Sequence, residues 1–380
     1  MELSAEDALR LNVLLANPLQ AVRIDESSMN VYALSEQGEA RISLNPRGRD
    51  DQYLKKVREL FSSQVLGSPG GYPIFLRRWT RMGQARDNTL EQLLLLGEPE
   101  AIVAVVHARG LTDEIARRAW WAMPVADNAR RMLERESIVK GRMGSELARY
   151  LIEFLPFETE HQAMVETVRL VLQPGLVDAE LRDKLWRQAK RKNSYFIGFM
   201  DALPDSLPEA GSARADAERV QQQLQVLVVA GNPIARQLCR CVSEPGQVYL
   251  KTAEAVLKKP ANQDIVVEFL KSVQNYFSGV CPNNDPAADL DTIISDADAL
   301  LDVPGVCPTT IAVQDVLSAV PKCRQDVKAM LALSWVGELL VNTIFARTDA
   351  IGSLMRKKIE PVTTPIQAQF DQLLKSSEDK

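Results

Sequence analysis

The sequence predicts a mainly α-helical protein with a small antiparallel β-meander near its N-terminus. Apolar residues recur at the helical spacing i, i+3, i+4 and i+7 along most of the chain. Only between residues 21 and 44 does the apolar period change to two, which indicates short strands. We expect an N-terminal α+β domain over residues 1–86, a helical array over 87–205 and a C-terminal helical domain over 213–380.

Length and composition fit a globular protein of about two or three domains. The chain has 380 residues, and 45 Lys and Arg against 50 Asp and Glu give a net charge of −5, which argues against general non-specific nucleic-acid binding. The first residues lack the layout of a signal peptide, and five cysteines, an odd number, do not fit a disulfide framework. We therefore expect a reducing, cytoplasmic environment.

The N-terminal domain begins with a predicted helix over residues 6–15, which ends near Asn17 and Pro18. Three short strands follow over residues 21–25, 30–34 and 39–44, separated by short polar turns. The next predicted helix, over residues 51–65, carries its apolar side chains on one side. We expect this helix to pack on one face of the meander.

The central part is predicted to be a run of short amphipathic helices. Thr112 and Asp178 are good N-caps, because each stands just before an apolar helical stripe. Short helices joined by short loops pack as antiparallel neighbours, as in HEAT or armadillo arrays. The breaks at Pro99, Pro124 and Pro156 are unevenly spaced, however, so an irregular helical domain remains an equal alternative.

The C-terminal domain is predicted to be helical again after a break over residues 204–213. Apolar stripes mark one helix over residues 220–228 and another over residues 266–276. Residues 327–346 are strongly apolar but are interrupted by Lys328 and Glu338. A membrane span needs about 20 residues with few or no charges, so we interpret this stretch as a single buried central helix.

All five cysteines lie in the C-terminal domain, and three are candidate reactive thiols: Cys281, Cys307 and Cys323. Cys307 stands just before a predicted helix starting near Thr309, and a thiol at a helix N-terminus can have a lowered pKa. The alternative is that these thiols are buried and inert, as free cysteines usually are. No Cys-x-x-Cys motif is present, so we predict no metal site and no cofactor.

A basic group interleaved with aromatic residues lies near the end of the helical array. Such a group can bind an acidic protein or, by base stacking, single-stranded nucleic acid. The alternative is a solvated helix face with Trp186 in the core. An acidic protein is the more plausible partner for a chain of negative net charge. The candidate anion-binding residues are Arg182, Lys184, Arg187, Lys190, Arg191 and Lys192. The aromatic residues of the same segment are Trp186, Tyr195 and Phe196.

No catalytic motif stands out in the sequence. Gly-x-Ser-x-Gly, Gly-x-Gly-x-x-Gly and His-Glu-x-x-His are absent, and only two histidines are present. We therefore predict no catalytic residues and favour a non-enzymatic protein.

Three segments carry a family resemblance: residues 7–15, the loop 66–73 with the following residues 77–83, and residues 120–132. Over most of its length the chain resembles the DsrS family. These are cytoplasmic proteins encoded with the reverse dissimilatory sulfite reductase genes of sulfur-oxidising bacteria. The resemblance implies a role in the oxidation of stored sulfur and assigns no role to any residue.

These observations lead to three hypotheses. The first is a non-enzymatic accessory or regulatory protein of sulfur oxidation that acts through protein–protein contacts. The second is a sulfur carrier or transferase that uses a cysteine persulfide. The third is a nucleic-acid-binding regulator that uses the basic group.

Overall fold

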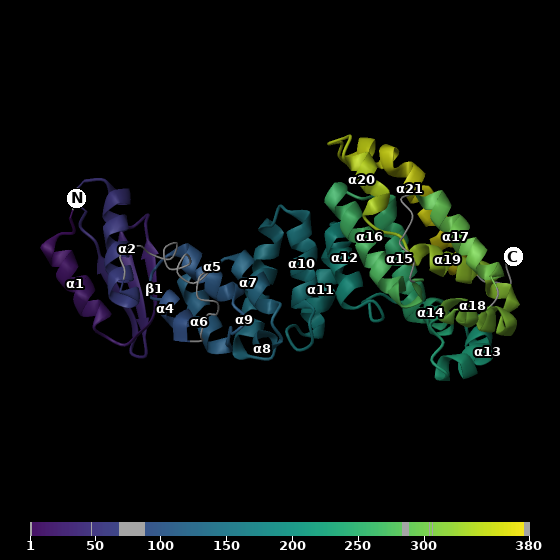
Figure 1. Cartoon of the computed structure of the whole chain (residues 1–380), viewed down its shortest axis with the longest axis horizontal. Coiled ribbons are helices and arrows are strands. Elements are labelled where there is room, and N and C mark those ends of the chain that lie inside the picture. The colour runs from purple at the N-terminus through teal and green to yellow at the C-terminus, as the bar shows by residue number, and fades with distance from the viewer. Residues whose placement is uncertain are drawn as a thin grey trace. The chain divides into compact units, whose positions relative to one another are not determined.

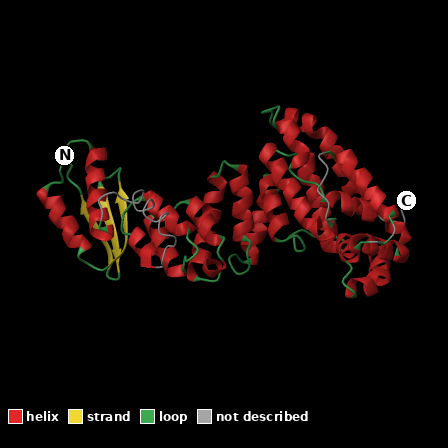
Figure 2. Cartoon of the chain, in the orientation of Figure 1, coloured by secondary structure: helices red, strands yellow, loops and turns green. Residues whose placement is uncertain are grey.

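The computed structural model describes residues 2–46, 48–67, 88–282, 289–303, 305 and 307–375. The protein is mainly α-helical, with one small sheet near the N-terminus (Figures 1 and 2). It forms two compact units, Met1–Phe154 and Leu155–Lys380. The predicted boundary at residue 86, the segment 77–83 and most of the loop 66–73 lie outside the described residues.

The N-terminal elements match the sequence prediction. They are α1 (Ala5–Leu15), β1 (Leu19–Asp25), β2 (Asn30–Ser35), β3 (Gly38–Ser43) and α2 (Asp50–Leu66). The strands form an antiparallel meander in the order β1-β2-β3. Val22 and Val31 of the sheet are buried in one cluster with Tyr53, Val57 and Phe61 of α2. The predicted packing of this helix on the meander is therefore confirmed.

Among the described residues of the first unit, those that follow α2 are mainly helical. These helices are α4 (Asn88–Leu93), α5 (Pro99–His107), α6 (Asp113–Ala122), α7 (Ala126–Leu133), α8 (Glu136–Val139) and α9 (Arg142–Phe154). Thr112 is the N-cap of α6, as predicted, because its hydroxyl accepts a hydrogen bond from the Ile115 amide at 3.3 Å. The sheet is joined to these helices, since the Val22 amide donates to the Leu94 carbonyl at 2.8 Å.

The second unit consists of helices, among its described residues. Helix α12 packs against α10 before it and against α15 and α16 after it, so the predicted boundary over residues 205–213 falls inside this unit. Asp178 caps α11, as predicted, because its carboxylate accepts from the Leu181 amide at 2.8 Å. The elements are η1 (Leu155–Phe157), α10 (His161–Val171), α11 (Ala179–Ala189), α12 (Asn193–Ala202), α13 (Ala217–Val229), α14 (Pro233–Val242), α15 (Glu244–Lys258), α16 (Gln263–Phe277), η2 (Ser278–Val280), α17 (Leu290–Asp302), α18 (Pro308–Ala319), η3 (Pro321–Cys323), α19 (Arg324–Ser334), α20 (Leu339–Phe345) and α21 (Gly352–Leu374).

Helices α10 and α12 approach each other closely at Gly198. A Cβ atom at this position would lie 2.6 Å from Cβ of Val168 and 2.8 Å from the carbonyl oxygen of Val165. Real Cβ atoms do not come this near to other heavy atoms. Glycine therefore permits the separation between two helices that both line the cleft described below.

A buried charge network holds the second unit together. The guanidinium of Arg214 contacts Asp216 at 2.7 Å and Asp326 of α19 at 2.9 Å, and all three side chains are almost fully buried. Arg214 also donates to the Leu373 carbonyl at 3.4 Å, and Gln372 donates to Asp326 at 2.6 Å. The network thus connects the segment before α13 with α19 and the end of α21.

The apolar stretch over residues 327–346 is buried in part but is not one helix. Helix α19 ends at Ser334, α20 starts at Leu339, and the two directions differ by 55°. The prediction of a single helix was therefore wrong, and Gly337 lies in the break, where it disfavours helix. Among the described residues no single helix is long and apolar enough to cross a membrane, although this bent pair passes by length and composition.

Candidate functional site

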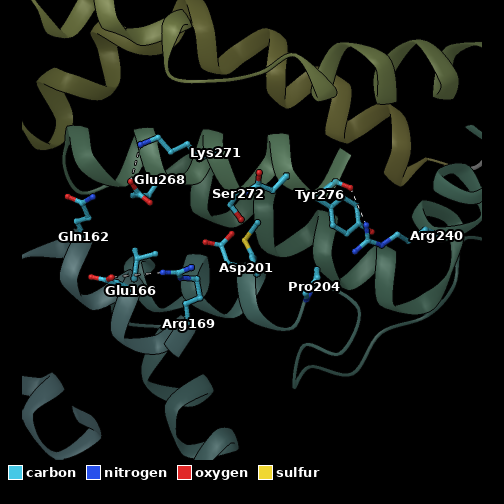
Figure 3. Close-up of a pocket in the computed structure, with 13 residues that line it drawn as sticks. Gln162, Glu166, Arg169, Asp201, Pro204, Arg240, Glu268, Lys271, Ser272 and Tyr276 are labelled. Atoms are coloured by element: carbon cyan, nitrogen blue, oxygen red, sulfur yellow. Dashed lines mark hydrogen bonds and ion pairs between the residues drawn. The ribbon is translucent and has the colours of Figure 1, made fainter. Parts of the chain in front are cut away.

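A cleft of about 530 Å³ opens between α10, α12, α14 and α16 in the second unit (Figure 3). Its apolar walls include Val165, Met200 and Pro204. The polar side chains that converge on it are Gln162, Glu166, Arg169, Asp201, Arg240, Glu268, Lys271, Ser272 and Asn275. A cleft of this volume is within the range of small-molecule sites, and its mostly polar lining suits a polar or charged ligand.

Asp201 is the most perturbed group of the cleft. It lies in the last turn of α12, and burial raises the pKa of its carboxyl to about 6. The Ser272 hydroxyl and the charge of Arg169 oppose this rise in pKa, and Glu268 adds to it (Figure 3). In the described part of the chain no cation lies within ion-pair distance of Asp201. A carboxyl with a perturbed pKa in a cleft marks a candidate functional site.

Two buried hydroxyl groups on α16 also belong to this site. Ser272 is 2 % exposed and Tyr276 is 4 % exposed, and neither hydroxyl makes a hydrogen bond of normal geometry with a described residue. The Tyr276 ring is fixed between the Tyr249 ring, at a centroid distance of 3.7 Å, and the Arg240 guanidinium, at 3.8 Å. Arg240 itself is held by Asp205 through contacts of 2.6 and 2.9 Å.

The charged residues at the mouth of the cleft pair with one another. Arg169 lies 4.0 Å from Glu166, and Lys271 lies 3.4 Å from both Glu268 and Glu338. Three carboxylates and three cations line the cleft, so its charged lining residues balance when all are ionised: Glu166, Asp201 and Glu268, and Arg169, Arg240 and Lys271. Asp205 and Glu338, which lie outside the lining, pair with Arg240 and Lys271 respectively.

The sequence analysis missed this cleft because its residues come from four separate helices and match no motif. One signal was present. Asp201 is the only charged residue of α12, whose other positions are largely apolar or aromatic. A carboxylate in an otherwise apolar helix is seldom buried without a reason. Within the described residues no group of three or more His, Cys, Asp or Glu side chains could hold a metal ion.

Of the three candidate thiols, Cys307 has the features of a reactive one. Its side chain is exposed. Cys307 is also the N-cap of α18, which agrees with its predicted position just before a helix. Its pKa is lowered, mainly by the Thr310 side chain and then by the Thr310 backbone amide, and its Sγ lies 3.4 Å from Thr310 Oγ1. A lowered pKa increases the fraction of nucleophilic thiolate at neutral pH.

The other thiols are less accessible. Cys323 is buried, and burial raises the pKa of its thiol to about 11. Cys281 is half-buried, with its Sγ 3.5 Å from the Pro282 carbonyl oxygen. Burial likewise raises the pKa of Cys239 to about 11 and that of Cys241 to about 12. These four cysteines behave as core or partly covered side chains.

The predicted basic group forms a solvated face on α11 and the turn after it. Lys184, Arg187, Lys190 and Arg191 are exposed, whereas Arg182 and Lys192 are half-buried. Two acidic neighbours pair with this face: Asp183 lies 3.6 Å from Arg182, and Glu209 lies 3.6 Å from Lys190. We call these six cations the α11 basic face.

The aromatic residues of this segment belong to the core. Trp186 is 4 % exposed and Tyr195 is 2 % exposed. Trp186 packs edge-on against Phe196 and Phe199 and donates a hydrogen bond to Glu209 at 2.9 Å. Buried rings cannot stack on nucleobases, so Trp186 and Tyr195 provide no platform for single-stranded nucleic acid.

No protein-family model, no curated protein and no solved structure matches this chain. Arguments about its function therefore start from its own residues and from the sequence resemblance given above.

Proposed function

We propose that this chain is a non-enzymatic accessory or regulatory protein of bacterial sulfur oxidation that binds an acidic protein partner in the cytoplasm. The observation that carries the proposal is the α11 basic face, where four cations are exposed on α11 and the turn after it while Trp186 of the same helix is buried. The link with sulfur oxidation rests on the resemblance to the DsrS family.

Electrostatics favour a protein partner over nucleic acid. Complementary charge accelerates association and selects partners, and a local basic face on a chain of net charge −5 can do this without general affinity for polyanions. Binding to nucleic acid by this segment would depend mainly on phosphate contacts, because Trp186 and Tyr195 are buried and Phe196 is half-buried.

The test is affinity capture from sulfur-grown cells of a sulfur-oxidising bacterium with a charge-reversed variant as comparison. We expect the wild-type chain to retain an acidic protein and the triple variant Lys184→Glu, Arg187→Glu and Arg191→Glu to lose it. The matched control reverses three exposed lysines elsewhere in the same unit, Lys251, Lys259 and Lys357. The absence of any partner above background, or equal capture by the α11 variant, would contradict the proposal.

The exposed Cys307 thiol supports a second candidate function, that of a persulfide sulfur carrier. The Cys307 thiolate would attack the outer sulfur of a donor persulfide, forming a Cys307 persulfide and releasing the donor thiolate. Its exposure and lowered pKa favour it over the other four thiols.

Mass spectrometry tests this second function. After exposure of the reduced protein to a persulfide donor, we expect one added sulfur atom per chain, at Cys307, and none in the Cys307→Ser variant. Equal slow labelling of all cysteines, or no added sulfur, would rule the carrier function out.

A further inference from the structure

We propose that the cleft between α10, α12, α14 and α16 binds a primary ammonium group carried on a short aliphatic chain, with Asp201 as its counter-ion. This site is separate from the α11 basic face, and its ligand would be a small molecule rather than a protein. The charges, hydrogen-bonding groups and walls of the cleft all fit such a ligand.

The charges of the cleft call for a cation. Glu166 and Glu268 each have a basic neighbour, Arg169 and Lys271 respectively, whereas Asp201 has none within ion-pair distance among the described residues. An unpaired carboxylate in a partly buried site is costly, and a ligand cation would offset that cost. Two of the three cations in the lining also pair with carboxylates outside it, Arg240 with Asp205 and Lys271 with Glu338.

The hydrogen-bonding groups also fit an ammonium. A primary ammonium has three donors and no acceptor, so it needs three acceptors around it. The Asp201 carboxylate is one acceptor. The buried Ser272 Oγ beside it is a second, because it makes no hydrogen bond of normal geometry with a described residue. The side chain of Asn275, one turn along α16 from Ser272, lines the same cleft and supplies a carbonyl oxygen.

The walls match an aliphatic chain. Val165, Met200 and Pro204 line the cleft beside the polar groups. A volume of about 530 Å³ lies within the range of small-molecule sites. An anionic ligand fits less well, because Arg169 and Lys271 already have carboxylate neighbours and the ligand would lie beside the Asp201 charge.

Binding should depend on the ionisation of Asp201. The charged groups that act on it are Arg169 of α10 and Glu268 of α16, and Tyr249 of α15 is electrostatically coupled to it. Helix α11 presents the apolar side chains of Leu185 and Trp186 to the core. An alkylammonium stays charged between pH 5 and pH 7.5, whereas Asp201 becomes protonated as the pH falls. The affinity of the cleft for an alkylammonium should therefore fall about tenfold from pH 7.5 to pH 5.

The experiment compares three probes that have four carbon atoms and different head groups: butylammonium, butanol and butyrate. Saturation-transfer NMR titrations of the full chain would measure their affinities. A ligand of this size with good efficiency reaches a Kd on the order of 1 mM. We expect butylammonium to bind, and butanol and butyrate to bind at least about tenfold more weakly, as expected for loss of a charge-assisted hydrogen bond.

Variants assign the binding to the cleft. Asp201→Asn should weaken butylammonium binding about tenfold or more, and Ser272→Ala should weaken it less. Asp315→Asn, an exposed aspartate on α18, should leave it unchanged. If Asp201→Asn does not fold, Ser272→Ala decides. Binding of butyrate as tight as that of butylammonium, no binding of any probe, or unchanged binding to the folded cleft variants would overturn the proposal.

Discussion

At the scale of single residues, Asp201 shows how burial and charge together define the cleft. Its side chain is half-buried in the cleft, and its pKa is raised by this burial and, to a smaller extent, by the charge of Glu268. The sequence places this aspartate in an apolar helix but does not show which residues of α10 and α16 lie opposite. Those contacts depend on tertiary packing, and no local pattern encodes them.

Asp201 should make the stability of the protein depend on pH. Its folded-state pKa of about 6 lies above the ordinary value of 3.8, so the folded state favours the protonated form. The folded state therefore loses stability as the pH rises from about 4 to about 6. Below about pH 4 the ionisation of Asp201 has no effect on stability, and above about pH 6 its destabilising effect is complete. Asp201→Asn should therefore stabilise the protein at pH 7.5, by at most about 3 kcal/mol, and little at pH 4.

Urea unfolding at the two pH values measures this difference, with Asp315→Asn as the control. A stabilisation of equal size at both pH values would show that the effect does not come from the charge of Asp201.

Cys307 was predicted correctly as a helix N-terminal thiol, because the proline and threonines that follow it are a local start signal. Its exposure could not be predicted, since Cys323 has a similar position next to a helix and is buried. The local sequence therefore identifies candidate thiols, and tertiary packing determines which of them is exposed.

Thr310→Val should slow the alkylation of Cys307 several-fold at neutral pH. The hydroxyl that lowers the thiol pKa is lost while the shape of the side chain is nearly kept. Iodoacetamide labelling followed by peptide mapping gives the rate, and Ser318→Ala on the same helix serves as the control. A rate equal to that of the wild type would show that Thr310 does not activate the thiol.

At the scale of elements, the helices with caps and clear apolar stripes were predicted well, including those over residues 220–228 and 266–276, whereas the single helix over residues 327–346 was not found. Helix α21 continues through Pro361 and Pro365, although proline normally ends a helix. Its buried stripe, which includes Met355, Ile359 and Phe370, packs against α15 and α19. Tertiary burial outweighs the local cost of two prolines, and a reading of local signals alone cannot detect this.

Gly198→Ala should destabilise the protein by about 1–3 kcal/mol, because the added methyl group overlaps Val168 and the Val165 carbonyl. Thermal or urea unfolding measures the change. Gly279→Ala is the matched control, since a Cβ there meets no other atom within 4 Å. Equal stabilities of the two variants would show that α10 and α12 can separate without cost.

At the scale of the whole molecule, the chain divides into two compact units, and each has its own buried residues. The predicted array over residues 87–205 is shared between them, because α10–α12 pack with the C-terminal helices. Sequence breaks such as Pro204 and Pro208 indicate where helices end. They do not indicate which helices share a core, and this is why the domain organisation was less predictable than the fold class.

The second unit should fold as an independent domain. A fragment of residues 155–380 contains all the elements of this unit, including the Arg214 network and the cleft. We expect it to be helical by circular dichroism and to unfold in one cooperative thermal transition. A fragment that lacks a cooperative transition would show that the unit depends on residues 1–154.

Arg214→Ala should reduce the stability of this unit by about 3–5 kcal/mol, because Asp216 and Asp326 would stay buried after loss of the guanidinium between them. Arg219→Ala is the control. Arg219 also contacts Asp216, at 3.5 Å, but it is partly exposed, so its loss should cost about 1 kcal/mol or less. Chemical unfolding compares the two variants, and similar losses would contradict a special role for Arg214.

The Leu373 carbonyl, which accepts hydrogen bonds from Arg214 and Gln247, has a consequence for the order of folding during synthesis. Domains made first on the ribosome generally fold first, so residues 1–154 can assemble while the chain is still growing. In the second unit, Arg214 and Asp326 acquire their last partners only when the end of α21 has left the exit tunnel. Until then, the apolar side chains that α15 and α19 bury against α21 stay uncovered.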